Sequence, residues 1–378
     1  MPAVKVPLCV PSIGEEEISE VSAVLRSGWL AHGPKNAEFE KLFSEYTEVK
    51  HAIAMNSCTS ALQVSIQALG LKGEIIVPSF TFVASANAIV TAGCTPRFAD
   101  IDYGTCNVSP QAVEKAIGKK TVAIMPVHFA GQACAMDEIM EMAETHGLAV
   151  IEDSAEAIGA EFSGKKTGSF GSAGCFSFYP TKNITTGEGG MLTTNNDGVA
   201  EKAKALKAHG IVSTAFERER KERPWLRQAE VAGYNFRLCD VLAAIGVAQM
   251  KKVDRMNDER RAIAKKYDRA FAGIDALDLP VEAEKCRHVY QMYTVKVGKQ
   301  IDRQAFVGKL RESGVQASVH FDPPVHLQPY YRKTGWKKSK LRVTESVAEK
   351  IVTLPIYAGM GREQSDCVVS AVENALKA

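Results

Sequence analysis

The chain has 378 residues, with 46 Lys and Arg, 44 Asp and Glu, and a net charge of +2. Such a balanced charge gives no broad field for binding nucleic acid or an anionic membrane, so small-molecule chemistry is favoured. The length predicts two domains, or one domain with an appendage. The nine cysteines are scattered and never form a CxxC pair, which indicates reduced thiols rather than a disulfide framework or a zinc site.

The N-terminal region argues against export and against a membrane span. The first residues, MPAVKVPLCVPSIGEEE, contain no apolar core of signal-peptide length, so we expect the protein to remain in the cytoplasm. Residues 75–94 carry no charge and imitate a membrane helix, but Pro78 and Asn87 interrupt them. We expect a buried strand, a turn and a buried helix there.

Short apolar runs alternate with helical patterns through the first half of the chain. Strands are expected within residues 51–57, 73–79, 121–129, 148–154 and 173–180, and helices within 59–69, 84–93, 109–118 and 136–147. This order predicts an α/β fold with a mostly parallel sheet that helices cover on both faces. In such sheets ligands bind at the carboxyl ends of the strands.

The pattern changes after residue 235. A long helical region with charged faces is followed by shorter strand and helix patterns, which indicates a smaller C-terminal α/β unit. We therefore predict a large domain over residues 1–250 and a small domain over residues 251–378, with the N-terminal segment able to pack on the small domain.

Several motif matches carry no chemistry. Residues 159–166, GAEFSGKK, resemble a phosphate-binding P-loop, but Lys166 stands where that motif needs Ser or Thr, so a turn is expected. His320 and His326 lack a third ligand with metal-site spacing, and no metal is expected. The basic run at 332–342 is more typical of a solvated face than of a binding patch.

Polar groups follow successive predicted strands. NSCTS at 56–60 suits either a phosphate at a helix start or a plain helix cap. Glu152 and Asp153 end an apolar strand and Glu156 follows, so either at least one of these carboxylates is buried with a defined partner or they are solvated loop acids. Ser177 and Lys182 follow the next strand. A phosphate site, a carboxylate and a lysine are together what pyridoxal phosphate requires.

At this point the chain is identified as similar to the DegT/DnrJ/EryC1/StrS family of sugar aminotransferases, a branch of the fold-type-I pyridoxal-phosphate enzymes. The resemblance covers nearly the whole chain, in motifs that stand in the family's order. These are SGWLAHGPKNAEFE, NSCTSAL, PSFTFVASANAI, PVHFAGQ, IEDSAEAIGA, FSFYPTKNITTGEGGM, GYNFRLCDVLAAIG and VHFDPPVHLQPYY.

The resemblance assigns expected roles residue by residue. Lys182 matches the Schiff-base lysine and Asp153 the carboxylate that pairs with the pyridine nitrogen, and these two are the expected catalytic residues. The expected cofactor-binding residues also include the phosphate-binding Cys58, Thr59 and Ser177, the ring-stacking Phe82, Glu156 near the ring, and Asn235, which would reach the phosphate from a neighbouring subunit. Shared sites of this kind imply a homodimer.

Some of these residues have an ordinary structural alternative. Taken alone, Phe82 is more often a core residue and Asn235 a turn residue. Glu156 stands where many relatives have glutamine or histidine, and His128 is equally well explained as a satisfied core histidine. The glycines of GEGG, at 187–190, are expected to pack closely against the site.

The implied reaction transfers an amino group from glutamate or glutamine to a nucleotide-linked 4-keto-6-deoxy sugar, with pyridoxamine phosphate formed between the two half-reactions. Likeness of SGWLAHGPKN and PVHFAGQ to members that act at carbon 4 favours that position. The alternatives are a sugar aminotransferase acting at carbon 3, an aminotransferase for an aminocyclitol precursor, and a cofactor-binding regulatory protein.

The substrate is expected to meet Trp29, His32, Tyr179 and His320. Two departures from the family pattern bear on its identity: Ala31 and His32 replace a common Thr-Thr pair, and Tyr179 stands where relatives often have histidine. The charged segment at 216–230 suits either contact with a sugar diphosphate or a solvated loop.

Overall fold

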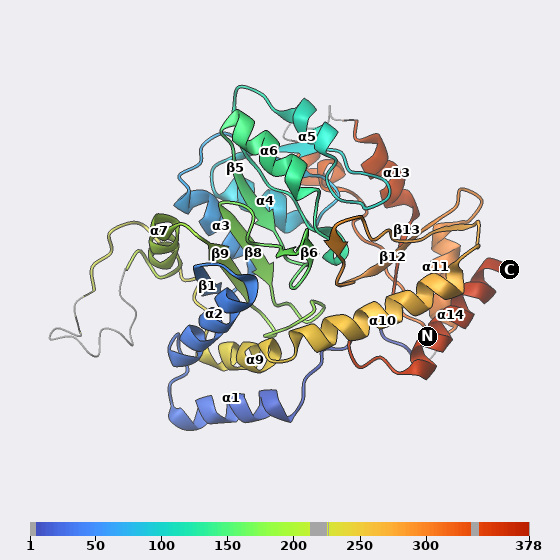
Figure 1. Cartoon of the computed structure of the whole chain (residues 1–378), viewed down its shortest axis with the longest axis horizontal. Helices are drawn as coiled ribbons and strands as arrows, with labels where there is room; N and C mark the ends of the chain where they lie inside the picture. Colours follow the sequence, from blue (N-terminus) through green and yellow to red (C-terminus); the bar gives the residue numbers. More distant parts are fainter. Residues whose placement is uncertain (1–4, 212–224, 226, 334–339, 378) are drawn as a thin grey trace.

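The computed structural model describes residues 5–211, 225, 227–333 and 340–377. Figure 1 shows a central sheet among helices, and a second group of strands and helices near the C-terminus. Among the described residues, no helix has the length and apolar character needed to cross a membrane. Residues 75–94 instead contain most of a strand and a short helix, as the interruptions predicted.

The largest sheet in the described part of the chain has seven strands, in the order β1-β9-β8-β5-β4-β2-β3. The strands are β1 (His51–Met55), β2 (Glu74–Pro78), β3 (Thr95–Ala99), β4 (Thr121–Ile124), β5 (Ala149–Asp153), β8 (Ala173–Ser177) and β9 (Gly190–Thr194). From β3 to β8 all neighbours are parallel, whereas β9 runs antiparallel to both β8 and β1. The prediction of a mostly parallel sheet is confirmed.

Each of the five predicted strands and four predicted helices is present. The helices of the large sheet are α2 (Pro34–Thr47), α3 (Cys58–Ala68), α4 (Val83–Thr91), α5 (Pro110–Ala116), α6 (Met136–His146), α7 (Asp197–Lys207) and α9 (Asp240–Met250). Strands β3 and β9 were not predicted. Pro96 and Arg97 interrupt the apolar pattern of β3, and Gly190 opens β9.

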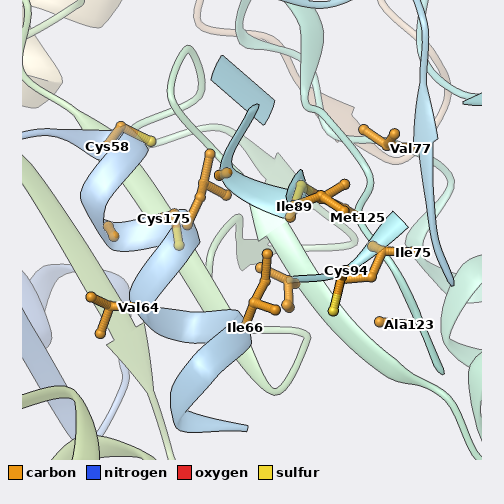
Figure 2. Packing of buried hydrophobic residues seen from close by; sticks show 14 of the residues in the cluster. Cys58, Val64, Ile66, Ile75, Val77, Ile89, Cys94, Ala123, Met125 and Cys175 are labelled. Carbon is orange, nitrogen blue, oxygen red and sulfur yellow. The ribbon is translucent and has the colours of Figure 1, made fainter. Parts of the chain in front are cut away.

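Alternation along the strands explains why helices cover both faces. Ile75 and Val77 of β2 belong to a core cluster with α3, α4 and α7, while Ile76 between them belongs to a cluster with α5 and α6. Successive side chains of a strand point to opposite faces, so an unbroken apolar run needs cover on both sides. Figure 2 shows part of the first cluster, with Val64 and Ile66 of α3 and with Ile75 and Val77 of β2.

A separate core lies among the C-terminal elements. It is built on α10 (Val253–Phe271), α11 (Arg303–Glu312) and α14 (Arg362–Lys377) with a sheet in the order β10 (Leu277–Asp278), β12 (Tyr293–Val297) and β13 (Ile351–Leu354). Val6 joins this core and pairs with Val315. The predicted boundary at residue 250 falls between α9 and α10, and the division into two domains stays a prediction.

The remaining elements are short or peripheral. They are α1 (Glu15–Ser27), α12 (Pro329–Lys333), α13 (Arg342–Lys350), the 3-10 turns η1 (Phe129–Gly131) and η2 (Val325–Leu327), and the strands β6 (Glu161–Phe162), β7 (Lys165–Lys166) and β11 (Cys286–Arg287). The near-match to a P-loop is the hairpin of β6 and β7, with a left-handed Gly164 at its turn. The predicted turn is confirmed.

Candidate active site

A cavity of about 540 Å³ opens at the edge where the parallel strands end. Nine of the residues singled out in the sequence line it: Cys58, Thr59, Phe82, Asp153, Glu156, Ser177, Tyr179, Lys182 and His320. They come from segments that follow β1, β2, β5 and β8, and from the C-terminal part of the chain. Parallel strands bring their carboxyl ends to one edge, which is why residues far apart in sequence meet here.

Lys182 lies in a tight turn after β8. Its backbone N–H donates to the carbonyl oxygen of Tyr179 at 2.9 Å. Its Nζ lies 3.2 Å from Oε1 of Glu156, and the two side chains are only 16% and 10% exposed. The lysine is therefore aimed into the cavity and paired there, and it is not a solvated surface residue.

Asp153 is the last residue of β5 and is almost completely buried. Its Oδ2 accepts a hydrogen bond from the Ser85 hydroxyl at 2.7 Å, and its Oδ1 accepts from the Ala155 N–H at 3.2 Å. Burial raises the pKa of Asp153, while these two donors act in the opposite direction. A carboxylate held in this way has a fixed orientation and gains from a cationic partner in the cavity.

Glu152 and His128 form a buried pair beneath the site. The Glu152 carboxylate accepts from the backbone N–H groups of Gly168, Phe170 and Gly171 and lies 3.1 Å from His128 Nε2. His128 Nδ1 accepts from the Cys134 N–H at 3.1 Å. Both ring nitrogens are thus occupied in the core, so the structure favours the satisfied core histidine for His128.

Phe82 immediately precedes α4, and its side chain is 64% exposed while it lines the cavity. An aromatic ring exposed in a cavity offers an apolar face to a planar ligand. Ser85 follows it on the first turn of α4, and its hydroxyl also bonds to Thr81. The alternative of a core phenylalanine is excluded by this exposure.

The start of α3 supplies backbone donors. Ser57 caps the helix by accepting from the Ser60 N–H at 3.1 Å, and Cys58 and Thr59 are the first helical residues. Free N–H groups at such a start, with the helix dipole, favour an anion. The Cys58 thiol is buried, and burial raises its pKa, so it is the backbone of this residue that suits anion binding.

Gly190, the first residue of β9, packs against the backbone at the start of α3. A Cβ atom added there would lie 2.3 Å from the backbone carbon of Ser57 and 2.4 Å from the Cys58 nitrogen. Only glycine allows β9 to approach the start of α3 so closely. The predicted close packing against the site is confirmed for Gly190, whereas nothing lies within 4 Å of a Cβ atom added at Gly187.

Three of the expected site residues do not line the cavity of their own chain. Asn235 pairs with Ala208, and its Oδ1 accepts from Arg237 Nε at 3.0 Å. Trp29 Nε1 donates to the carbonyl oxygen of His32. Nε2 of His32 lies 3.1 Å from Nζ of the buried Lys207, and burial, together with the Lys207 charge, lowers the pKa of His32 to about 4.

The two remaining substrate candidates do face the cavity. Tyr179 is half exposed there. His320 Nδ1 lies 2.7 Å from the Thr353 hydroxyl, and burial lowers the pKa of His320, which favours a neutral ring. Of the charged segment at 216–230, positions 216–224 and 226 lie outside the described residues, as do positions 334–339 of the basic run.

Ser85 and Gln291 are among the polar residues of the site that the sequence reasoning missed. Helical spacing between Phe82 and Ser85 could have indicated that both face the same ligand. No local signal marks Gln291, which reaches the cavity from the segment before β12 and donates through Nε2 to the Thr181 carbonyl oxygen. Within the described residues, no cluster of three or more candidate metal ligands occurs.

These residues fit pyridoxal phosphate. Asp153 is buried and forms no salt bridge among the described residues, and Phe82 exposes its ring in the cavity. The first turn of α3 adds backbone N–H donors at the same cavity. A lysine between them completes the set that this cofactor needs.

Comparison with known proteins supports the same assignment. The model of the DegT/DnrJ/EryC1/StrS aminotransferase family matches residues 11–373. The spore coat polysaccharide biosynthesis protein SpsC of Bacillus subtilis is 40% identical over 378 residues, covering 98% of this chain and 97% of that protein.

Solved structures agree over almost the whole fold. PseC of Helicobacter pylori, an aminotransferase involved in the biosynthesis of pseudoaminic acid, is 28% identical with a TM-score of 0.92, covering 98% of this chain and 99% of that one. The PMP form of Spr1654 from Streptococcus pneumoniae is 27% identical with a TM-score of 0.93, covering 99% of both chains, and its PLP form has a TM-score of 0.91.

Proposed function

Since this chain belongs to the DegT/DnrJ/EryC1/StrS aminotransferase family and is a pyridoxal-phosphate-dependent sugar aminotransferase, we propose that it makes a 4-amino sugar. The amino group would come from glutamate or glutamine and pass to a nucleotide-linked 4-keto-6-deoxy sugar. The observation that supports this most directly is the meeting of Lys182, Glu156 and Asp153 in one cavity with an exposed Phe82.

The cofactor is proposed to lie between Phe82 and the strand ends. When bound, pyridoxal phosphate supplies a conjugated ring that withdraws electrons from the carbon bearing the amino group. The Asp153 carboxylate would keep a proton on the ring nitrogen, because a buried anion is stabilised by an adjacent cation. Ser85 and Ala155 fix the orientation of that carboxylate through their hydrogen bonds.

The phosphate would be held by backbone donors and hydroxyls. The first turn of α3, with Cys58 and Thr59, offers N–H groups, and Ser177 lines the same cavity at the end of β8. Asn235 is proposed to reach the phosphate of a second copy, since it lies outside the cavity wall of its own chain. In that arrangement the working unit is a symmetric dimer.

Lys182 is proposed to move the proton in both half-reactions. Its Nζ would take the proton from the donor's α-carbon and return a proton where the product forms, in the manner of a general base and acid. Glu156 Oε1 accepts a hydrogen bond from Nζ and so stabilises the ammonium form while the lysine carries the proton. The cavity wall keeps both groups away from bulk water.

The substrate position can be tested by following one half-reaction. The protein is converted to its pyridoxamine form with excess glutamate, freed of donor, and offered nucleotide-linked 4-keto and 3-keto sugars and a cyclic ketone without nucleotide. We expect the 4-keto-6-deoxy sugars to restore the absorbance of the aldehyde form. Restoration by the 3-keto sugars alone, or without a nucleotide, would replace this proposal by one of the alternatives.

A further inference from the structure

The loop that joins β8 to β9 carries two polar side chains at the active-site cavity, Tyr179 and Glu188. Tyr179 is 50% exposed, and Glu188 is exposed as well. Within the part of the chain that the structure describes, neither side chain takes part in a hydrogen bond or a salt bridge. Both are therefore free to meet a ligand in the cavity.

Hydrogen bonds hold this loop in a defined shape. The Phe178 N–H donates to the Gly189 carbonyl oxygen at 3.0 Å. The Phe178 carbonyl oxygen accepts from the Thr186 N–H at 3.0 Å and from the Thr185 hydroxyl at 2.8 Å. The Thr186 hydroxyl donates to the Glu188 carbonyl oxygen at 2.6 Å. The backbone that presents the two side chains is thus fixed before a ligand arrives, as a selective site requires.

The alternation of β8 continues past its end and directs Tyr179 to the cavity. Ser177 and Tyr179 line the cavity, whereas Phe178 between them is completely buried in the core that includes α2 and α9. On the other arm of the loop, a Cβ atom added to Gly189 would lie 3.1 Å from a ring carbon of Phe178. Gly189 is therefore pressed against the core, and Glu188 stands on the cavity side just before it.

The pair lies beside the reactive lysine. The Tyr179 carbonyl oxygen accepts from the Lys182 N–H at 2.9 Å, and the Nζ of this lysine must reach the reacting carbon of each substrate. The part of a nucleotide-linked keto-sugar that lies here is therefore the sugar ring, which carries the reacting carbon, and not the nucleotide.

The chemistry of the pair suits a sugar ring. A carboxylate accepts hydrogen bonds through two oxygens and donates none, so its ligand must be a donor. Ring hydroxyls are donors, whereas the diphosphate of the same substrate is anionic and is repelled by a carboxylate. The ring of a tyrosine adds an apolar face against which the C–H groups of a sugar can pack.

We propose that Glu188 and Tyr179 form the sugar-ring subsite, in which the Glu188 carboxylate accepts a hydrogen bond from a free hydroxyl on carbon 3 and Tyr179 packs against the ring. In a 4-keto-6-deoxy sugar, carbon 3 is the neighbour of the keto carbon that bears a hydroxyl, since carbon 5 bears a methyl group. This inference rests on the proposed function, because it takes a 4-keto sugar as the substrate. It selects substrates whose hydroxyl at carbon 3 is unmodified.

Binding of an unreactive analogue tests the contact without turnover. The probe is the nucleotide sugar that restores the aldehyde form in the half-reaction above, with a hydroxyl at carbon 4 in place of the ketone, and calorimetry measures its Kd on the cofactor-loaded protein. We expect the Kd to rise about tenfold or more in Glu188→Ala and less in Glu188→Gln, which keeps one acceptor oxygen. The Kd of the free nucleoside diphosphate should change by less than about twofold. A tighter nucleoside diphosphate complex in Glu188→Ala would place the carboxylate at the diphosphate and overturn the proposal.

A double-mutant cycle with the substrate identifies the hydroxyl. Starting from the pyridoxamine form, the keto-sugar is compared with its 3-deoxy and 2-deoxy counterparts. We expect loss of the 3-hydroxyl to lower kcat/KM by about thirtyfold or more in the parent protein, but by less than about threefold in Glu188→Ala, where its partner is already gone. Equal losses in the two proteins would contradict the contact, and coupling to the 2-hydroxyl instead would refute the assignment to carbon 3.

Substitutions of Tyr179 separate its ring from its hydroxyl. Tyr179→Phe keeps the apolar face, so the Kd of the analogue should change by less than about threefold, whereas Tyr179→Ala should raise it by about tenfold. A loss in Tyr179→Phe as large as in Tyr179→Ala would show that the hydroxyl, and not the ring, meets the sugar.

Two further measurements exclude other ligands for Glu188. The KM for glutamate should differ by less than about threefold between the parent and Glu188→Gln, and a larger rise with unchanged analogue binding would place the donor's ammonium there instead. Sedimentation should give the same oligomeric state for both proteins, because dissociation of the variant would mean that the carboxylate contacts a second copy. Either result would overturn the sugar-ring subsite.

Failure of this proposal is distinguishable from failure of the proposed function. If the proposed function fails, the unaltered protein in its pyridoxamine form converts no nucleotide-linked 4-keto sugar. If only the subsite is wrong, that conversion remains, and the parent and the Glu188 variants bind the analogue equally well.

Discussion

Nζ of Lys182 lies 3.2 Å from Oε1 of Glu156, in a cavity where both side chains are largely buried. The other oxygen of Glu156 accepts from the Ala130 N–H at 2.9 Å. One carboxylate therefore links the lysine after β8 to the η1 turn that follows β4. The sequence allowed for proximity of Glu156 to the cofactor ring, and the structure adds this direct link to the lysine.

Substitution of Glu156 should separate these two contacts. Glu156→Gln keeps one oxygen, so we expect the fold to persist and kcat/KM to fall by about tenfold. Glu156→Ala leaves the buried Ala130 N–H without an acceptor, which should lower the free energy of unfolding by about 1–3 kcal/mol as well. Urea unfolding and steady-state kinetics measure both effects. An alanine variant as stable as the parent would contradict this account.

Replacement of Lys182 should remove the chemistry and leave the fold. We expect Lys182→Ala to lose amino transfer by about a thousandfold or more, because a positioned proton-transfer group is lost. The rate of amino transfer is measured from the change in cofactor absorbance in a single turnover, after addition of cofactor and glutamate. Lys166→Ala is a matched control, since Lys166 is 20% exposed and lies 3.8 Å from Glu48 outside the cavity. Retained turnover in Lys182→Ala would refute its proposed role.

Asp153 should make the stability of the cofactor-free protein depend on pH. Burial raises its pKa above 3.8, so the folded state holds the proton more tightly than the unfolded state. Stability therefore falls as pH rises from about 3.8 through the raised pKa, and the full cost is present above it. Urea unfolding measured across this pH range should show that the stability of Asp153→Asn does not fall in this way.

Binding of pyridoxal phosphate should offset the destabilisation that the buried, ionised Asp153 causes. If Asp153 pairs with a protonated ring nitrogen, adding pyridoxal phosphate at neutral pH should raise the melting temperature more in the parent protein than in Asp153→Asn. Equal shifts in the two proteins would mean that the carboxylate does not sense the cofactor.

Gly190 should be intolerant of even one methyl group. Gly190→Ala would force the Ser57 and Cys58 backbone away from β9, and we expect cofactor affinity to fall about tenfold and stability to fall by about 1–3 kcal/mol. Cofactor titration and urea unfolding provide the measurements. Gly308→Ala in α11 is the control, because nothing lies within 4 Å of its added methyl group and alanine favours a helix. Similar behaviour of the two variants would contradict the close-packing explanation.

Local patterns predicted most of the large sheet. β2 and β5 are short apolar runs bounded by polar residues, and α6 has clear helical periodicity, so period and composition sufficed. β3 was missed because Pro96 and Arg97 interrupt its apolar pattern. Such residues are tolerated there because β3 lies at the edge of the described sheet, where one side of its backbone has no partner strand. The polar strand ends located the cavity, because parallel strands end at one edge.

The sequence by itself determined the α/β class, the resemblance to a family, and the set of residues at the strand ends. Only the tertiary structure decided that Glu156 pairs with Lys182, that Ser85 orients Asp153, and that Gln291 reaches the same cavity from the segment before β12. The physical reason is that periodicity reports which face of an element is buried. It does not report which distant side chains then share a partner, since that depends on how the elements pack.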